Sequence, residues 1–167
     1  QKNDLTLELV MNQEQRNKWE NDWSKNPLNV NIYYDSVENE MKKIAKNGGS
    51  FTLSENLRLT SPLIVESDFT LTFYNGAFDG DEGQFVDYDS LKAMVVVKPG
   101  ATFTFNGCGY FNTGHKTTQI TCIRMMGGSD EPSKVVINNG SLIGTYHTIL
   151  IDEDCQNAEV EINGGDM

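Results

Sequence analysis

The chain has two parts that differ in how their hydrophobic residues are spaced. In residues 1–49 the apolar positions follow local strand and helix periods. Two runs alternate apolar with polar residues, as half-buried strands do: Leu5, Leu7 and Leu9, and then Val30, Ile32 and Tyr34. The sequence therefore predicts a short strand in each of these two places.

Two helices are predicted in the same part. Polar helix formers over residues 13–25 include Trp19 and Trp23, which are four positions apart and so share one helical face. A second helix is predicted over residues 35–46, with a glycine pair after Asn47 to end it. Its apolar residues form one stripe: Val37, Met41, Ile44 and Ala45.

After residue 49 the helical period disappears and a repeat of short β runs replaces it. Each unit has an apolar strand, a turn, a strand of alternating residues and an Asn-Gly corner. Four units begin at residues 63, 94, 122 and 149, a period of about 30 residues. One such unit cannot bury its own apolar face, so units of this kind stack and share a core. The pattern predicts a parallel β-solenoid over residues 50–167.

An antiparallel sandwich is the alternative, because Asn-Gly also marks hairpin turns. The constant order of strands within each unit favours the solenoid, since a sandwich needs no internal similarity. In a solenoid, the Asn side chains at equivalent corners are expected to hydrogen-bond along the axis as a ladder. The helix over residues 35–46 would cover the first end of the core. At the other end Asp166 and Met167 follow a corner directly, so we expect the natural chain to continue or this edge to meet a partner.

The residues around the first unit resemble a known family. Residues 44–59 read IAKNGGSFTLSENLRL, and SPLIV at 61–65 and FTL at 69–71 follow. This stretch is similar to the opening of pectate-lyase-like, right-handed parallel β-helix domains, which begin with a helix, a Gly-Gly stop and a first turn. Such domains occur in tailed-bacteriophage head fibres and tailspikes, in bacterial surface proteins and in polysaccharide-cleaving enzymes. The segment before the helix is more similar to the attachment region of a phage head fibre.

This resemblance implies a non-enzymatic structural protein on the virion surface, either a fibre or a head-decoration subunit. Residues 1–34 would be the attachment and oligomerisation segment, residues 35–49 the capping helix and residues 50–167 the β-helix. The implied partners are two further copies in a homotrimer, capsid or other virion proteins, and host-surface glycans. The alternative is a bacterial cell-surface or secreted β-helix protein that binds or cleaves polysaccharide.

Charge and composition exclude several classes of function. The formal net charge of the 167 residues is −11, and most of it lies in the repeat, which argues against binding to nucleic acid. The longest apolar run, residues 93–97, is far shorter than the roughly 20 residues of a membrane-spanning helix, so no membrane partner is expected. Cys108, Cys122 and Cys155 are scattered, and we predict that they are reduced packing residues.

The sequence predicts no catalytic, cofactor or metal site. The acidic residues cluster in predicted turns: Asp79, Asp81, Glu82, Asp87, Asp89, Asp152, Glu153 and Asp154. These clusters lack the spacing of a calcium loop and of a catalytic carboxylate pair, so we interpret them as solvated turn residues. His115 and His147 occupy dissimilar positions in different units and have no partner at metal or nucleophile spacing.

The predicted interaction residues all lie in the first part of the chain: Leu5, Leu7, Leu9, Trp19 and Trp23. The leucines need a partner strand, and the tryptophans need a surface that covers their shared face. In residues 94–97 both alternating sets are apolar, and a neighbouring chain would cover the second set. We therefore expect a homo-oligomer, and the resemblance sets its number at three. In the competing interpretation the first segment folds back onto its own solenoid.

Overall fold

The computed structural model describes residues 7–10, 30–33, 37–53, 57–59, 61–73, 77–80, 93–112, 120–128, 130–144 and 146–165. The chain divides into two compact units, Gln1–Met41 and Lys42–Met167, and the division falls inside helix α2 (Val37–Asn47). None of the helical residues in these ranges forms a helix long and apolar enough to cross a membrane.

The first unit contains two parallel strands. Strand β1 (Leu7–Val10) pairs with β2 (Val30–Tyr33), so that Leu7 lies opposite Val30 and Leu9 opposite Ile32. The two strands predicted from alternation are confirmed over these residues, and β1 has a partner strand within its own chain. Three residues of the predicted interface, Leu5, Trp19 and Trp23, lie outside the described residues, as does the helix predicted over residues 13–25.

Helix α2 is the helix that the apolar stripe predicted. Its Met41 and Ala45 side chains are fully buried. It ends at Asn47. The next residue, Gly48, has a φ of 90° that suits glycine, and its N–H donates to the Ile44 carbonyl at 2.8 Å. The Ala45 carbonyl accepts a hydrogen bond of 3.1 Å from the N–H of Glu66, the residue after β5 (Leu63–Val65). The last turn of α2 is thereby bonded to the turn that follows β5.

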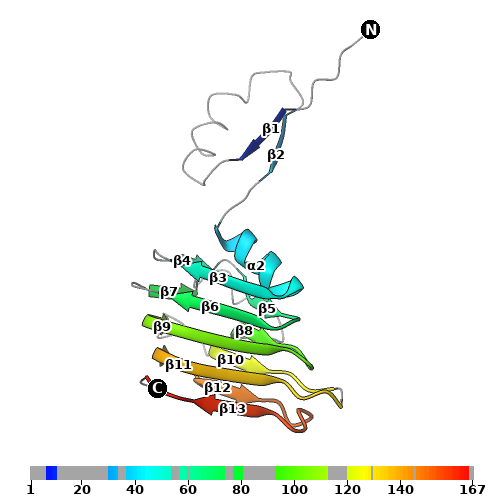
Figure 1. The fold of residues 1–167 in the computed structure, drawn as a ribbon, viewed down its shortest axis with the longest axis vertical. Coiled ribbons are helices and arrows are strands. Elements are labelled where there is room, and N and C mark those ends of the chain that lie inside the picture. Colours follow the sequence, from blue (N-terminus) through cyan, green and yellow to red (C-terminus); the bar gives the residue numbers. More distant parts are fainter. Residues whose placement is uncertain are drawn as a thin grey trace. The chain divides into compact units, whose positions relative to one another are not determined.

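The second unit consists mainly of two parallel sheets (Figure 1). One sheet has the order β12 (Ile149–Ile151), β10 (Thr121–Met125), β8 (Ala93–Val97) and β5. The other has the order β13 (Glu159–Ile162), β11 (Lys134–Ile143), β9 (Thr102–Asn112), β6 (Phe69–Phe73) and β3 (Gly49–Leu53). Two shorter strands, β4 (Leu57–Leu59) and β7 (Ala77–Gly80), extend this second sheet. From β8 to β13 successive strands alternate between the two sheets. The described part of the chain is mainly β, with one helix.

Parallel pairing in register, which the repeat predicted, is confirmed. Leu63 lies opposite Val95, Val95 opposite Ile123, and Ile123 opposite Ile149. These four residues match the predicted unit starts to within one residue. Strand β6 also pairs with β9 in the parallel direction, Phe69 opposite Phe103. The antiparallel sandwich is therefore wrong for these strands.

The register stacks apolar side chains into buried columns. Phe69, Phe103 and Val135 follow one another across three strands and are at most 1% exposed. The Phe69 and Phe103 rings are stacked, with centroids 6.1 Å apart. Strand β8 is buried on both faces, because all five of its side chains have no exposed surface in the single chain. Its second apolar face therefore needs no neighbouring chain, contrary to the expectation from the sequence.

Two local predictions need correction. Asp79, expected in a turn of a long insertion, lies on strand β7, which pairs with both β4 and β9. The Asn-Gly corners do not end β9 and β11, which continue through them as strands of 11 and 10 residues. In β11 the register shifts on either side of Asn139, next to Gly140 with its φ of 107°. A bulge with a glycine at positive φ bends a strand without ending it, so a turn signal does not mark a strand end here.

Replacing Phe103 by alanine tests the stacked core. We expect Phe103→Ala to lower the free energy of unfolding by about 3–5 kcal/mol, because it opens a cavity and removes the ring that stacks on Phe69. The matched control is Thr104→Ala on the same strand, whose half-buried side chain points to the other face and should cost about 1 kcal/mol or less. Urea unfolding followed by circular dichroism measures both. Equal losses in the two variants would contradict the buried column.

Candidate functional site

The last strand of each sheet forms the most distinctive surface of the described structure. Within the described ranges, β12 pairs only with β10 and β13 pairs only with β11, so each has one unpaired edge. Unpaired edges of this kind can accept a further strand. We call this surface the open end. It comprises β12 and β13 with the exposed apolar residues Ile151, Val160 and Ile162, the carboxylates Glu159 and Glu161, and Asn163.

At the open end the apolar columns of the core reach the surface. Val160 lies opposite Val135, and Ile162 lies opposite Ile137. The β11 residues are at most 1% exposed, whereas Val160 is 38% and Ile162 is 45% exposed. In the other sheet Ile151 is 44% exposed, although it lies opposite the fully buried Met125. The same column positions are thus buried in β6, β9 and β11 of one sheet and in β5, β8 and β10 of the other, and they are exposed in β13 and β12.

Asparagine side chains form a ladder along one side of the second sheet. The Asn138 amide donates to Asn106 Oδ1 at 2.6 Å, and the Asn163 amide donates to Asn138 Oδ1 at 2.8 Å. The ladder predicted from the repeated corners is therefore confirmed for three of the four units, and Asn75 of the first unit lies outside the described residues. The two bonds run in the same direction, because each amide donates to the Oδ1 atom of the preceding unit.

A lysine binds both carboxylates of β13. Lys134 Nζ lies 3.3 Å from Glu159 Oε2 and 3.2 Å from Glu161 Oε2. These contacts raise the pKa of Lys134, with the hydrogen bond to Glu161 as the largest cause and that to Glu159 next. The pKa of Glu161 is lowered, first by the hydrogen bond from Asn163 and then by Lys134. The three side chains are 35–63% exposed, so solvent screens their ion pairs. The pairs therefore contribute little to the stability of the fold, and their main effect is to hold the charged groups in place.

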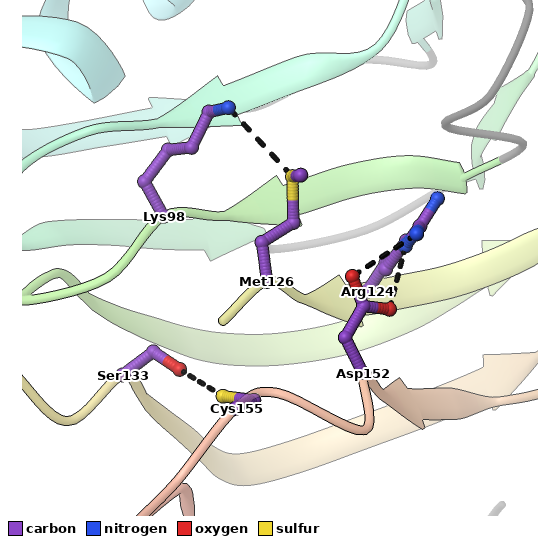
Figure 2. Close-up of polar contacts among 6 residues, drawn as sticks. All are labelled: Lys98, Arg124, Met126, Ser133, Asp152 and Cys155. Carbon is purple, nitrogen blue, oxygen red and sulfur yellow. Dashed lines mark hydrogen bonds and ion pairs between the residues drawn. The ribbon is translucent and has the colours of Figure 1, made fainter. Parts of the chain in front are cut away.

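The turns beside the first sheet are joined by side-chain contacts between successive layers (Figure 2). Arg124 on β10 binds Asp152 with two hydrogen bonds, 2.8 Å from Nε to Oδ1 and 3.0 Å from Nη2 to Oδ2. Both side chains are largely buried, at 21% and 15% exposure. The interpretation of Asp152 as a solvated turn residue is therefore wrong, because the forked guanidinium of the preceding layer holds it.

Sulfur atoms take part in two further contacts between layers (Figure 2). The Lys98 ammonium lies 3.7 Å from Met126 Sδ, and Ser133 Oγ lies 3.1 Å from Cys155 Sγ. Cys122 is buried and Cys155 is half-buried, and neither forms a disulfide within the described part of the chain. The side chain of Cys108 lies outside the described part of the chain.

Other residues singled out in the sequence are only partly placed. Asp81, Glu82, Asp87, Asp89 and His115 lie outside the described residues, and only the backbone is described for Leu7, Leu9 and Asp79. His147 is half-buried, and its ring lies 3.9 Å from that of Tyr146. Among the side chains that are described, no group of three or more His, Cys, Asp or Glu residues could hold a metal ion.

The predicted interface and the open end differ in location. The sequence pointed to Leu5, Leu7, Leu9, Trp19 and Trp23, whereas the exposed apolar residues of the open end lie on β12 and β13. The exposed residues of the open end belong to the fourth unit of the repeat, Ile149 to Ile162. Comparisons with protein-family models, with curated proteins and with solved structures each found no match.

We call Lys134, Glu159, Glu161 and Asn163 the charge set. It predicts a measurable shift in the pKa of Glu161. A carboxylate with a lowered pKa in the folded state stabilises the fold above its unfolded pKa, about 4.3, and loses that effect as the pH falls through its folded value. Carboxyl-carbon NMR titration should give Glu161 a pKa below the ordinary value. We expect Asn163→Ala and Lys134→Met each to raise it, because each removes a donor. Asp130→Asn, in a turn outside this charge set, should leave it unchanged. A Glu161 pKa that stays constant in all three variants would contradict the charge set.

Proposed function

We propose that this chain folds as a right-handed parallel β-helix and serves as a non-enzymatic structural subunit of a virion, a fibre or a head-decoration protein. The observation that carries the proposal is the repeated parallel layer. From β8 to β13 the strands alternate between two sheets, and each new strand places its side chains in register with those of the previous strand in the same sheet. Such a fold grows along one axis and gives a stiff projection. Parallel crossover connections are right-handed in about 98% of cases, which supports the proposed handedness.

The contacts of three described carboxylates, Asp152, Glu159 and Glu161, support a structural function. Asp152 is held by Arg124, and Glu159 and Glu161 are held by Lys134. Each of these acids belongs to a contact between neighbouring layers. A glycoside hydrolase instead needs two carboxyl groups facing each other across a substrate, with one of them protonated. In our proposal the acids fasten layers together and give the surface its negative charge.

The proposed location can be tested on purified particles. Density-banded virions induced from the source culture should contain peptides of this chain when they are analysed by mass spectrometry. Gold-labelled antibodies against the protein should decorate the particle exterior. If the peptides occur only in the cell-surface or secreted fraction, the virion role is wrong. Turnover of polysaccharide by the purified protein would then favour the alternative bacterial β-helix protein.

We further propose that the subunit is a homotrimer that associates and attaches through residues 1–34. The intrachain pairing of β1 with β2 changes the grounds for this proposal, because β1 no longer requires a strand from another copy. The main support is the face that Trp19 and Trp23 would share on the helix predicted from the sequence, since large aromatic side chains four residues apart on a helix usually cover or meet another surface.

Mass measurement in solution tests the trimer. At micromolar concentration, light scattering should give three times the chain mass. Trp19→Ala should dissociate the trimer and leave the β signal in circular dichroism unchanged. The matched control is Tyr146→Ala, which removes an aromatic residue that is 55% exposed in the second unit and should leave the mass unchanged. A monomeric wild-type protein with both tryptophans already shielded from quenchers would contradict the proposal.

A further inference from the structure

We propose that Asn139 is a site of self-modification, at which the Gly140 nitrogen attacks the Asn139 side-chain amide and converts this residue to aspartate and isoaspartate. The inference concerns one bend of strand β11 and does not depend on the proposed virion role. Asn-Gly pairs favour this reaction, because a glycine nitrogen has no neighbouring Cβ to shield it. The chain contains five such pairs, at Asn47, Asn75, Asn106, Asn139 and Asn163. The second of these pairs lies outside the described residues.

The reaction needs only these two residues and water. The Gly140 nitrogen gives its proton to hydroxide and forms a bond to Cγ of Asn139. The bond from Cγ to the side-chain nitrogen then breaks, and that nitrogen takes a proton from water and leaves as ammonia. A cyclic imide remains. Water hydrolyses it at either of its two carbonyl groups, which gives aspartate or isoaspartate with one new carboxylate, and no electrons are transferred.

The structure places the two reacting groups side by side. The Gly140 N–H donates a hydrogen bond of 2.9 Å to Oδ1 of Asn139. Asparagine favours this conformation, in which its side chain folds back onto nearby backbone. Oδ1 is bonded directly to Cγ, so the attacking nitrogen lies next to the carbon that it attacks. Groups held this close react far faster than the same groups would as free partners.

The bend of β11 gives this pair room to react. The pairing of β11 with β9 shifts in register on both sides of Asn139, and Gly140 has a φ of 107°. Asn139 is exposed, so hydroxide and water reach its side chain. The backbone of Gly165 packs against Gly140, and a Cβ at residue 165 would lie 3.0 Å from the Gly140 nitrogen. A glycine at that position therefore keeps a side chain away from the reacting nitrogen.

The Asn-Gly pair of the preceding unit is held in a different way. Oδ1 of Asn106 accepts a hydrogen bond of 2.6 Å from the Asn138 amide, so its side chain is turned toward the next unit. Gly107 is buried, and a Cβ there would lie 2.5 Å from the Phe105 ring and 3.3 Å from the Asn139 carbonyl oxygen. A cyclic imide at Asn106 would need space that these groups already occupy.

Two further Asn-Gly pairs are held by hydrogen bonds of other kinds. The Asn163 amide donates to Asn138 Oδ1 at 2.8 Å and to Glu161 Oε1 at 2.9 Å, so the group that would leave as ammonia is bound twice. After Asn47, the Gly48 N–H donates to a carbonyl of helix α2 at 2.8 Å, which holds this nitrogen in the last turn of the helix. The fold therefore favours the reaction at residue 139 among the four described pairs.

The modification changes both the charge and the main chain at the bend. Either product adds a carboxylate at residue 139, which lies in register with Asn106. Isoaspartate also adds one carbon atom to the main chain. Because the register already shifts on both sides of Asn139, β11 can take up this atom without a new break in its pairing with β9. We therefore expect the modified protein to keep its fold and to bind more tightly to an anion-exchange column.

The test compares the Asn-Gly pairs within one sample of the full 167-residue chain. The protein is incubated at mildly alkaline pH, and peptide mapping with electron-transfer fragmentation follows the conversion of each asparagine. In the folded protein Asn139 should convert about tenfold faster than the other described pairs, because its side chain is placed against its own glycine nitrogen. In urea the rates should converge, since unfolding removes this placement.

Hydroxylamine gives a second readout, because it cleaves the chain at a cyclic imide. Cleavage of the incubated protein should give fragments 1–139 and 140–167. Asn139→Gln should prevent this cleavage, since glutamine closes the larger ring only slowly. The matched control is Asn163→Gln, which removes another Asn-Gly pair and should leave the cleavage after residue 139 unchanged.

Three results would overturn the proposal. One is a rate at Asn139 in the folded protein that is no higher than the rates at Asn106 and Asn163, or a preference for Asn139 that persists unchanged in urea. The second is cleavage after residue 139 that Asn139→Gln does not reduce. The third is loss of the β signal in circular dichroism as conversion proceeds, because the bend would then not accommodate the product.

Discussion

The parallel register of the strands is the constraint on which the rest of this structure depends. Side chains alternate between the two faces of a strand, so a slip of one residue would turn every apolar side chain to the wrong face. Here Phe69, Phe103 and Val135 keep a single buried column across three strands. The energy of burying these side chains therefore specifies the register as well as stabilising the fold.

The polar contacts depend on the same register. The Asn ladder crosses the bulge of β11, where Asn138 bonds to Asn106 and the neighbouring Asn139 is the residue in register with Asn106. Arg124 reaches Asp152 because the turn after β12 lies one layer beyond β10. Lys134 reaches Glu159 because the two residues are directly opposite in register. These contacts are individually modest, but each would be lost if the strands slipped, so together they favour one alignment.

A repeating fold of this kind concentrates its unsatisfied groups at its ends. Each inner layer has its apolar columns covered and its backbone paired on both sides. The first end of the β unit is bonded to α2 through Glu66 and Ala45. At the last layer Ile151, Val160 and Ile162 are exposed although their column partners are buried.

The sequence alone determined the class of fold and the approximate register. A period of about 30 residues with short strands indicated stacked parallel strands, because each unit needs neighbours to bury its apolar face. The stripe of Val37, Met41, Ile44 and Ala45 indicated the helix, and the repeated asparagines indicated the ladder. These features depend on local periodicity, which can be read directly from residue order.

Only the tertiary structure decided what covers each surface. The burial of both faces of β8, the ion pair of Asp152 with Arg124 and the pairing of β1 with β2 join residues far apart in sequence. The strand at Asp79 was also missed, since β7 is stabilised by its neighbours β4 and β9 and has no clear alternation of its own. Periodicity identifies the face that a residue occupies within its own strand. Whether that face is buried, paired or left open depends on neighbours that only the folded chain brings together.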